Sequence, residues 1–146
     1  MGKRRKAREC AIQCLYQWDM TGSDVEIILA GYWEAHPSSP EVAEFTDHLV
    51  RGTLAHVDEI DPLIGAQAEH WRSDRIGKVE RSILRLGAYE LMYEPNTPKA
   101  VVIDEAIEIS KRFCGPDAGH FINGVLDGIR EKLGSSESDA VPTGSA

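Results

Sequence analysis

Long apolar runs and paired cysteines are both missing from this sequence of 146 residues. No run approaches the roughly 18 consecutive apolar residues that a membrane-spanning helix needs, so we expect no membrane-spanning segment. The basic N-terminus is followed by no apolar segment of the kind found in secretory signals, which makes the cytoplasm the expected location. The three cysteines are odd in number and form no CxxC pair, a pattern typical of reduced thiols rather than of disulfides.

Sequence signatures of catalysis are missing as well. The chain has no GxSxG, P-loop, GxGxxG or HExxH motif, and its five histidines show no metal-ligand spacing. Cys10 and Cys14 share a helical face, but that face is apolar and is more typical of buried thiols than of metal ligands. We therefore expect no enzymatic activity, no metal and no cofactor.

The net charge of −8 is distributed unevenly along the chain. Residues 1–18 hold five of the 16 lysines and arginines and one of the 24 acids, which gives this segment +4 and the remainder −12. A basic end on an acidic body attracts polyanions to one place on the surface and repels them elsewhere. RNA is one such partner, while a membrane surface, an acidic protein or a basic tail without a fixed partner are alternatives that charge alone leaves open.

Helical periodicity dominates the part of the chain that is patterned. Apolar residues recur at intervals of three and four, and no stretch shows the two-residue alternation of a strand. Turn residues divide this pattern into about seven helices, which predicts an all-α bundle. The expected helices are 5–20, 24–34, 40 to about 52, 62–71, 77–93, one from the break at 94–98 to about 113, and 117–133. They form one domain over 1–133, and the small polar residues 134–146 are expected to be a disordered tail.

The helix expected over 5–20 carries an unusual polar face. On a helical wheel at about 100° per residue, Arg5, Arg8, Ile12 and Tyr16 lie together, almost opposite the apolar stripe. Guanidinium groups beside an exposed aromatic ring suit single-stranded RNA, because bases stack on both and phosphates pair with the cations. The alternative is that a neighbouring helix covers Ile12 and Tyr16 and that the arginines are only a solvated face.

The last helix offers a second aromatic candidate. Phe121 lies at the edge of its apolar stripe, one turn from an N-terminal end whose free N–H groups attract phosphate. Such a phenylalanine is more often a core residue than a stacking surface. Gly124 and Gly128, four residues apart, are expected to permit close packing of another helix.

The helix expected over 77–93 carries two acidic residues on its apolar side. Glu80 and Glu90 fall inside its apolar arc, whereas Arg81 and Arg85 lie on its polar side. A carboxylate in a buried stripe must find a cation or hydrogen-bond donors, since unpaired burial costs several kcal/mol. Either each acid has a partner inside the protein, which is the commoner outcome, or part of this face meets another protein.

Four of these segments, in this order along the chain, resemble the NusB family of bacterial antitermination factors. They are RECAIQCLYQW at 8–18, VERSILRLGAYEL at 79–91 with Trp71 ahead of it, VIDEAIEISK at 102–111 and FINGVLD at 121–127. The resemblance covers most of the chain between 5 and 129, and the last three segments together are highly specific.

The resemblance implies a fold and a set of partners. The fold would be all-α, with two packed three-helix-bundle-like halves at about 5–56 and 57–133. The protein would bind the boxA element of RNA as a heterodimer with NusE, a small-subunit ribosomal protein, and would join the transcription elongation complex to promote ribosomal RNA transcription. The RNA-binding residues that the resemblance implies are Lys3, Arg4, Arg5, Lys6, Arg8, Tyr16, Asp117 and Phe121. It implies that Asp117 tempers RNA affinity and that Glu80 contacts NusE.

Two other functions remain open from the sequence. One is a protein-only scaffold, in which the region around Glu80 docks a partner and the basic end is incidental. The other is an accessory domain of an RNA cytosine methyltransferase system, because NusB-like domains also occur fused to such enzymes.

Overall fold

The computed structural model describes residues 2–71 and 76–140, with side chains described as far as Gly134. Within these residues the chain forms helices and no strands, so the predicted all-α class is confirmed. The helices are α1 (Lys3–Thr21), α2 (Val25–Ala35), α3 (Pro40–Ala55), α4 (Val57–His70), α5 (Lys78–Tyr93), α6 (Lys99–Cys114) and α7 (Ala118–Ala140). Among the described residues, no helix is both long enough and apolar enough to cross a bilayer.

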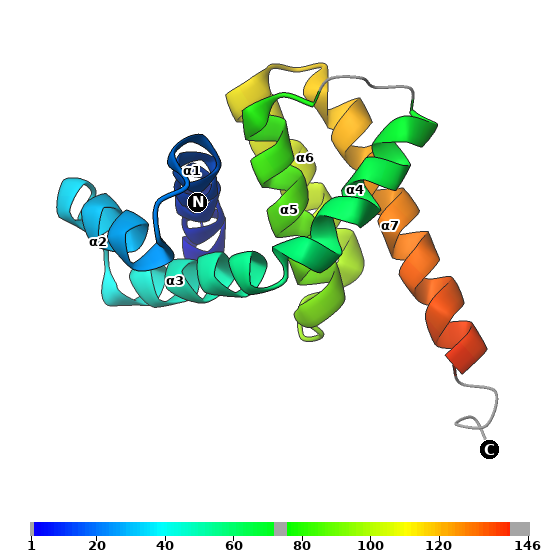
Figure 1. Ribbon diagram of the computed structural model, residues 1–146, viewed down its shortest axis with the longest axis horizontal. Coiled ribbons are helices and arrows are strands. Elements are labelled where there is room, and N and C mark those ends of the chain that lie inside the picture. Colours follow the sequence, from blue (N-terminus) through cyan, green and yellow to red (C-terminus); the bar gives the residue numbers. More distant parts are fainter. Residues whose placement is uncertain (1, 72–75, 141–146) are drawn as a thin grey trace.

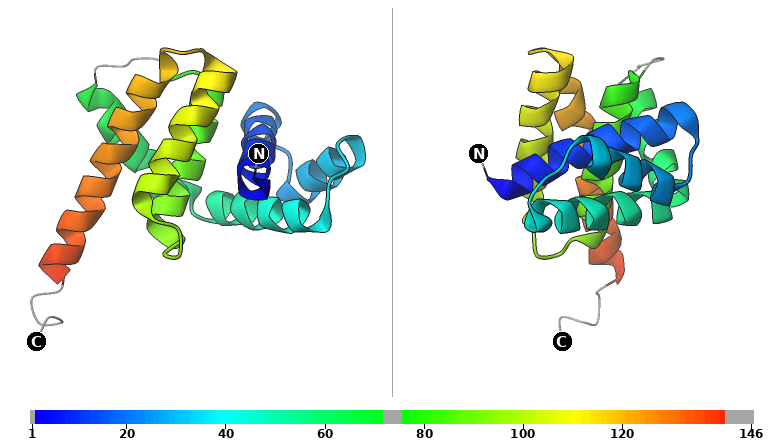
Figure 2. Two further views of the ribbon diagram at one scale, coloured as in Figure 1. Left: turned by 180° about the vertical axis from the view of Figure 1, so that it is seen from behind. Right: turned by 90° about the vertical axis from the view of Figure 1, so that its left-hand side faces the viewer.

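The helices lie in two groups that meet along α5. In Figure 1, α1, α2 and α3 form one side of the molecule, and α4, α5, α6 and α7 form the other. Helix α1 packs on α2, α3 and α5, while α5 contacts α1, α3, α4, α6 and α7. The turned views in Figure 2 show that the C-terminal end of α7 projects away from the other helices. Because α5 is surrounded, every residue from Ser82 to Leu91 is buried.

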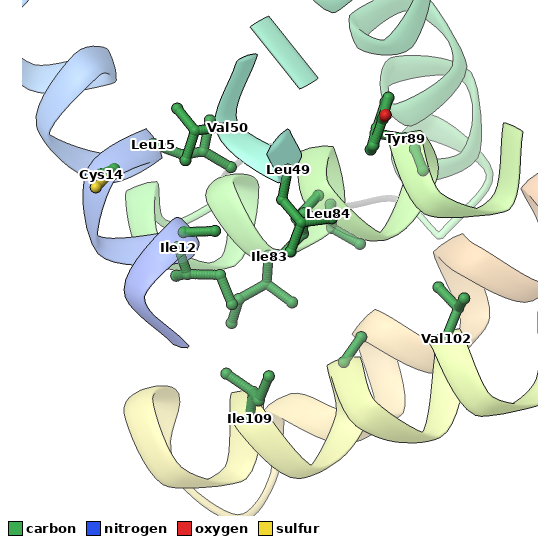
Figure 3. Packing of buried hydrophobic residues seen from close by; sticks show 14 of the residues in the cluster. Ile12, Cys14, Leu15, Leu49, Val50, Ile83, Leu84, Tyr89, Val102 and Ile109 are labelled. Carbon is green, nitrogen blue, oxygen red and sulfur yellow. The ribbon is translucent and has the colours of Figure 1, made fainter. Parts of the chain in front are cut away.

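One continuous core joins the two groups. Figure 3 shows side chains of α1 (Ile12, Leu15), α3 (Leu49, Val50), α5 (Ile83, Leu84) and α6 (Val102, Ile109) in this core. Each of these side chains is almost completely removed from water. Burial of an aliphatic side chain of this size contributes about 1.5–3 kcal/mol, so this shared core stabilises α1 against α5.

The junction between the two groups is shorter than the sequence suggests. The sequence predicts a change of helix over 52–61 and a fourth helix starting near Pro62. In the structure α3 continues to Ala55, α4 begins at Val57, and Pro62 lies inside α4. His56 alone separates the two helices, so a proline near the start of a helix was a poor marker of its first residue. Pro62 removes only one backbone hydrogen bond there, because it lacks an N–H.

Close packing of α4 on α7 explains the two glycines of the last helix, as predicted. A Cβ atom at Gly124 would lie 2.1 Å from Cζ2 of Trp71, and one at Gly128 would lie 2.0 Å from Oε1 of Gln67. Side chains of α4 therefore occupy the space above both glycines.

The C-terminal boundary differs from its prediction. We expected the last helix to end near Leu133 and a disordered tail to start at Gly134, but α7 continues to Ala140. The rest of the expected tail, residues 141–146, lies outside the described residues.

Candidate nucleic-acid interface

The basic residues at the start of α1 divide into surface and buried groups. Lys3 and Lys6 are exposed, and Nζ of Lys3 lies 2.7 Å from the exposed Glu41 on α3. The exposed Arg4 lies with its guanidinium 4.5 Å from the ring centre of Phe45, a cation–π contact. Exposed pairs of this kind contribute about 0–1 kcal/mol, so these cations are easily redirected to phosphates.

Arg8 is not on the surface. Its Nε and Nη2 donate to Oε2 and Oε1 of Glu90 at 2.9 and 2.8 Å, and both side chains are buried. Burial alone would lower the pKa of Arg8, but the hydrogen bonds and the negative charge of Glu90 outweigh it and raise the pKa. The guanidinium therefore stays charged and joins α1 to α5. Glu90 has an internal partner, which confirms the commoner of the two outcomes expected for it.

Ile12 is buried as well, so the solvent face drawn on the helical wheel is wrong for both Arg8 and Ile12. The physical reason is that α1 is covered by α3 on one side and by α5 on another. The same misplacement occurred on α5, where Arg85 was expected on the polar side. Arg85 is buried, and its guanidinium donates to Asp61 on α4 at 2.9 Å and to Asp19 on α1 at 3.2 Å.

Tyr16 is exposed, as predicted, with 37% of its surface accessible. It lines a groove of about 340 Å³ between α1, α5 and α6. The residues that line this groove are Ile12, Gln13, Tyr16, Gln17, Val79 and Phe113. Phe113, which is also 37% exposed, was not predicted from the sequence as a site residue. The only local signal for it was an aromatic residue near the end of an apolar helix, two positions before the Gly115-Pro116 break.

Ion pairs between α1 and α6 connect this groove to the basic end of α1. Nη2 of Arg5 donates to Oε2 of Glu105 at 2.7 Å, and Nη1 of Arg112 donates to Oε2 of Glu9 at 3.0 Å. Arg5, Glu9, Gln13 and Tyr16 are spaced so that they lie along one face of α1. In this α1–α6 seam, formed by Arg5, Glu9, Glu105 and Arg112, the two cations are partly exposed, whereas Glu9 is buried.

The other predicted site residues are not part of the groove. Phe121 is half-buried and packs against the core, and Asp117 is exposed at the start of α7. Asp117 lines a separate hollow of about 560 Å³ together with Lys111 and His120. Glu80 is half-buried, and its Oε1 accepts a hydrogen bond from the N–H of Gly77 at 2.9 Å, which caps α5.

Nothing in the described residues resembles a metal centre: no group of three or more histidine, cysteine or acidic side chains lies close enough together to bind a metal. Cys10 and Cys14 are both buried, and burial raises the pKa of the Cys14 thiol to about 12. Such a thiol is protonated and unreactive at neutral pH.

Comparisons with known proteins agree on one family. The family model described as the NusB family matches residues 5–131. The transcription antitermination protein NusB of Sorangium cellulosum is 40% identical over 139 residues, which cover 95% of this chain and 99% of the relative. The protein of the same name from Streptomyces griseus is 45% identical over 129 residues, covering 86% of this chain and 90% of the relative.

Solved structures give the same result. The solution structure of NusB from Aquifex aeolicus has a TM-score of 0.81 and 31% identity, and the match covers 93% of each chain. A crystal structure of the antitermination factors NusB and NusE in complex with double-stranded RNA has a TM-score of 0.80 and 31% identity. That match covers 90% of this chain and 98% of the other.

Proposed function

Because this chain belongs to the NusB family, we propose that it is a transcription antitermination factor that binds boxA-type single-stranded RNA together with NusE. In this role it promotes ribosomal RNA transcription as part of the elongation complex in the cytoplasm. It acts by binding and not by catalysis. Its relatives are antitermination proteins, and one structural relative is held in a complex with NusE and RNA.

The observation that carries this proposal is the exposed ring of Tyr16 in a groove beside α1, on the helix face that also carries Arg5. Lys3, Arg4 and Lys6 supply positive charge on the surface of an otherwise acidic protein. Tyr16 supplies a flat apolar face on which a base stacks. These two features together are what single-stranded RNA requires of a protein surface.

Each remaining site residue has a role consistent with its position. The Arg5 guanidinium, shared with Glu105, lies between the basic end and the groove and contacts phosphate from there. The exposed carboxylate of Asp117 repels the RNA backbone and so lowers affinity. Phe121 supports the start of α7 from its half-buried position and presents its exposed edge to the RNA.

Glu80 is the proposed contact for NusE. Its carboxylate caps α5 through the N–H of Gly77 and is still partly open to solvent. It therefore has a second acceptor oxygen available for a basic side chain of the partner.

A titration of boxA RNA with and without purified NusE tests the proposal. If three to five phosphates are neutralised, the logarithm of the binding constant falls with the logarithm of salt concentration at a slope of about −2 to −3.5. Tyr16→Ala should weaken binding by about 1–3 kcal/mol and leave the circular dichroism spectrum unchanged. Tyr93→Ala, at an equally exposed tyrosine that does not line the groove, is the matched control.

Two outcomes would contradict the proposal. The first is wild-type affinity in the Tyr16→Ala protein, which would remove this ring from the interface. The second is stronger binding of a double-stranded RNA of the same sequence than of the single strand, because a stacking surface for unpaired bases gives no advantage to a duplex.

A further inference from the structure

The groove beside Tyr16 has two aromatic walls from different helices. Tyr16 of α1 and Phe113 of α6 both line it, and each ring is 37% exposed. Val79 and Ile12 form its apolar floor, so a flat apolar ligand placed there loses contact with water on more than one side. A surface with one exposed ring supports stacking on one face of a base, whereas two rings allow contact with both faces.

Two exposed cations lie beside the groove. The side chain of Arg112 is 59% exposed, and its guanidinium lies 5.8 Å from the ring centre of Phe113. Lys78, next to Val79 in the sequence, is 54% exposed and lies 3.4 Å from Asp19. Both cations are paired with acids of α1 through only part of their donors, so each still has N–H groups directed to solvent.

One basic residue at the start of α1, Arg5, lies on the same helix face as the groove. Arg5 and Tyr16 lie on the same face of α1, about 16 Å apart along the helix axis at the usual rise per residue. Between these two residues, Glu9 on the same face of α1 accepts a hydrogen bond from Arg112 of α6. A polyanion that contacts Arg5 can therefore extend along the α1–α6 seam, past Arg112, to the groove.

A fixed polar group lies at the edge of the groove. The hydroxyl of Tyr32, buried on α2, donates to Oε1 of Gln13 at 3.1 Å. This bond occupies the amide oxygen and leaves the NH₂ group of Gln13 as a donor at the groove. A donor held in this way recognises an acceptor on a base edge, such as a carbonyl oxygen or a ring nitrogen.

From these observations we propose that the groove is a pocket for one unstacked nucleobase of the RNA, held between the rings of Tyr16 and Phe113 and read at its edge by Gln13. The proposal rests on the proposed function and deepens it. It makes Phe113 a base-contacting residue and Tyr32 a positioning residue that acts through Gln13.

A set of RNAs with one abasic site each, one for every position of the boxA element, tests the pocket. In the wild-type protein, fluorescence anisotropy should show one position at which removal of the base weakens binding by roughly 5- to 150-fold. Phe113→Leu keeps apolar bulk but removes the ring. It should weaken binding of intact RNA, and at that one position the abasic penalty should be smaller than in the wild type, because only Tyr16 and Gln13 still contact the base.

The controls separate this inference from the function on which it rests. Tyr93→Leu removes an equally exposed ring outside the groove and should reproduce the wild-type abasic profile. If the wild-type protein binds boxA RNA but Phe113→Leu keeps the same penalty at every position, the pocket is refuted and the function stands. If the wild-type protein binds no RNA with or without NusE, the function fails and the pocket fails with it.

Base identity tests the role of Tyr32. The four bases at the sensitive position should bind the wild-type protein with different affinities. Tyr32→Phe releases Gln13, so these affinities should become nearly equal while the abasic penalty remains. Unchanged preference in Tyr32→Phe would refute the role of Gln13 in reading the base.

Discussion

Replacing Arg8 by methionine separates two roles of this residue, an RNA contact that the family resemblance implies and a structural link that the structure shows. In the structure the guanidinium makes two hydrogen bonds to Glu90, and both side chains are almost fully buried. Removing one member of a buried pair leaves the other charge without a partner, which costs about 3–5 kcal/mol. For a chain of this size, that loss lowers the Tm by roughly 10–15 °C.

Urea unfolding followed by circular dichroism measures this loss. Arg112→Met is the matched control, because its partner Glu9 is also buried but Arg112 itself is 59% exposed. That replacement should cost well below the loss at Arg8, since water solvates the exposed guanidinium and reaches the pair. The double variant Arg8→Met, Glu90→Leu should recover most of the stability, because no unpaired charge remains in the interior.

The Arg8→Met variant also tests whether Arg8 contacts RNA. At a temperature at which Arg8→Met is folded, the salt dependence of RNA binding should keep its wild-type slope, because a buried guanidinium contacts no phosphate. A slope reduced in magnitude by about 0.7 would mean that Arg8 neutralises one phosphate. That result, or a stability loss no larger than that of Arg112→Met, would refute the assignment of Arg8 as an anchor between α1 and α5.

Two further predictions concern acids. Hydrogen bonds from Arg5, together with its charge, lower the pKa of Glu105 below its ordinary value of 4.5, against the opposing effect of burial. Because the pKa of Glu105 is lower in the folded than in the unfolded protein, Glu105 stabilises the fold above about pH 4.5 and loses this contribution as the pH falls through the folded pKa. The urea midpoint should therefore fall less steeply with acidification in Glu105→Gln than in the wild type. Equal slopes in the two proteins would contradict the pKa shift. Glu80→Lys should abolish NusE binding in a pull-down and spare the binding of RNA alone, whereas Glu80→Gln keeps the cap on Gly77 and tests the charge separately. Loss of RNA binding in Glu80→Lys without loss of NusE would reverse the proposed roles.

The local features of this protein follow from its sequence because they depend on neighbours along the chain. Helical spacing of apolar residues predicts the helices, and turn residues predict most of their ends. The N-cap at Ser39 is an example, since its Oγ accepts from the N–H of Val42 at 3.4 Å, as Pro40 and Glu41 lead one to expect. The uneven charge can be read directly from the sequence, whereas the exposure of Tyr16 agrees with what the family resemblance implies.

Contacts between residues that lie far apart in the sequence are determined only by the tertiary structure. A helical wheel assumes that each helix has one buried side, but α1 and α5 are packed on several sides. The wheel therefore placed Arg8, Ile12 and Arg85 on the solvent side, whereas all three are buried in the protein. Arg8 and Glu90 are separated by 82 positions, and no local pattern relates them. Phe113 meets the groove of Tyr16 for the same reason, because only the packing of α6 beside α1 brings the two rings to one surface.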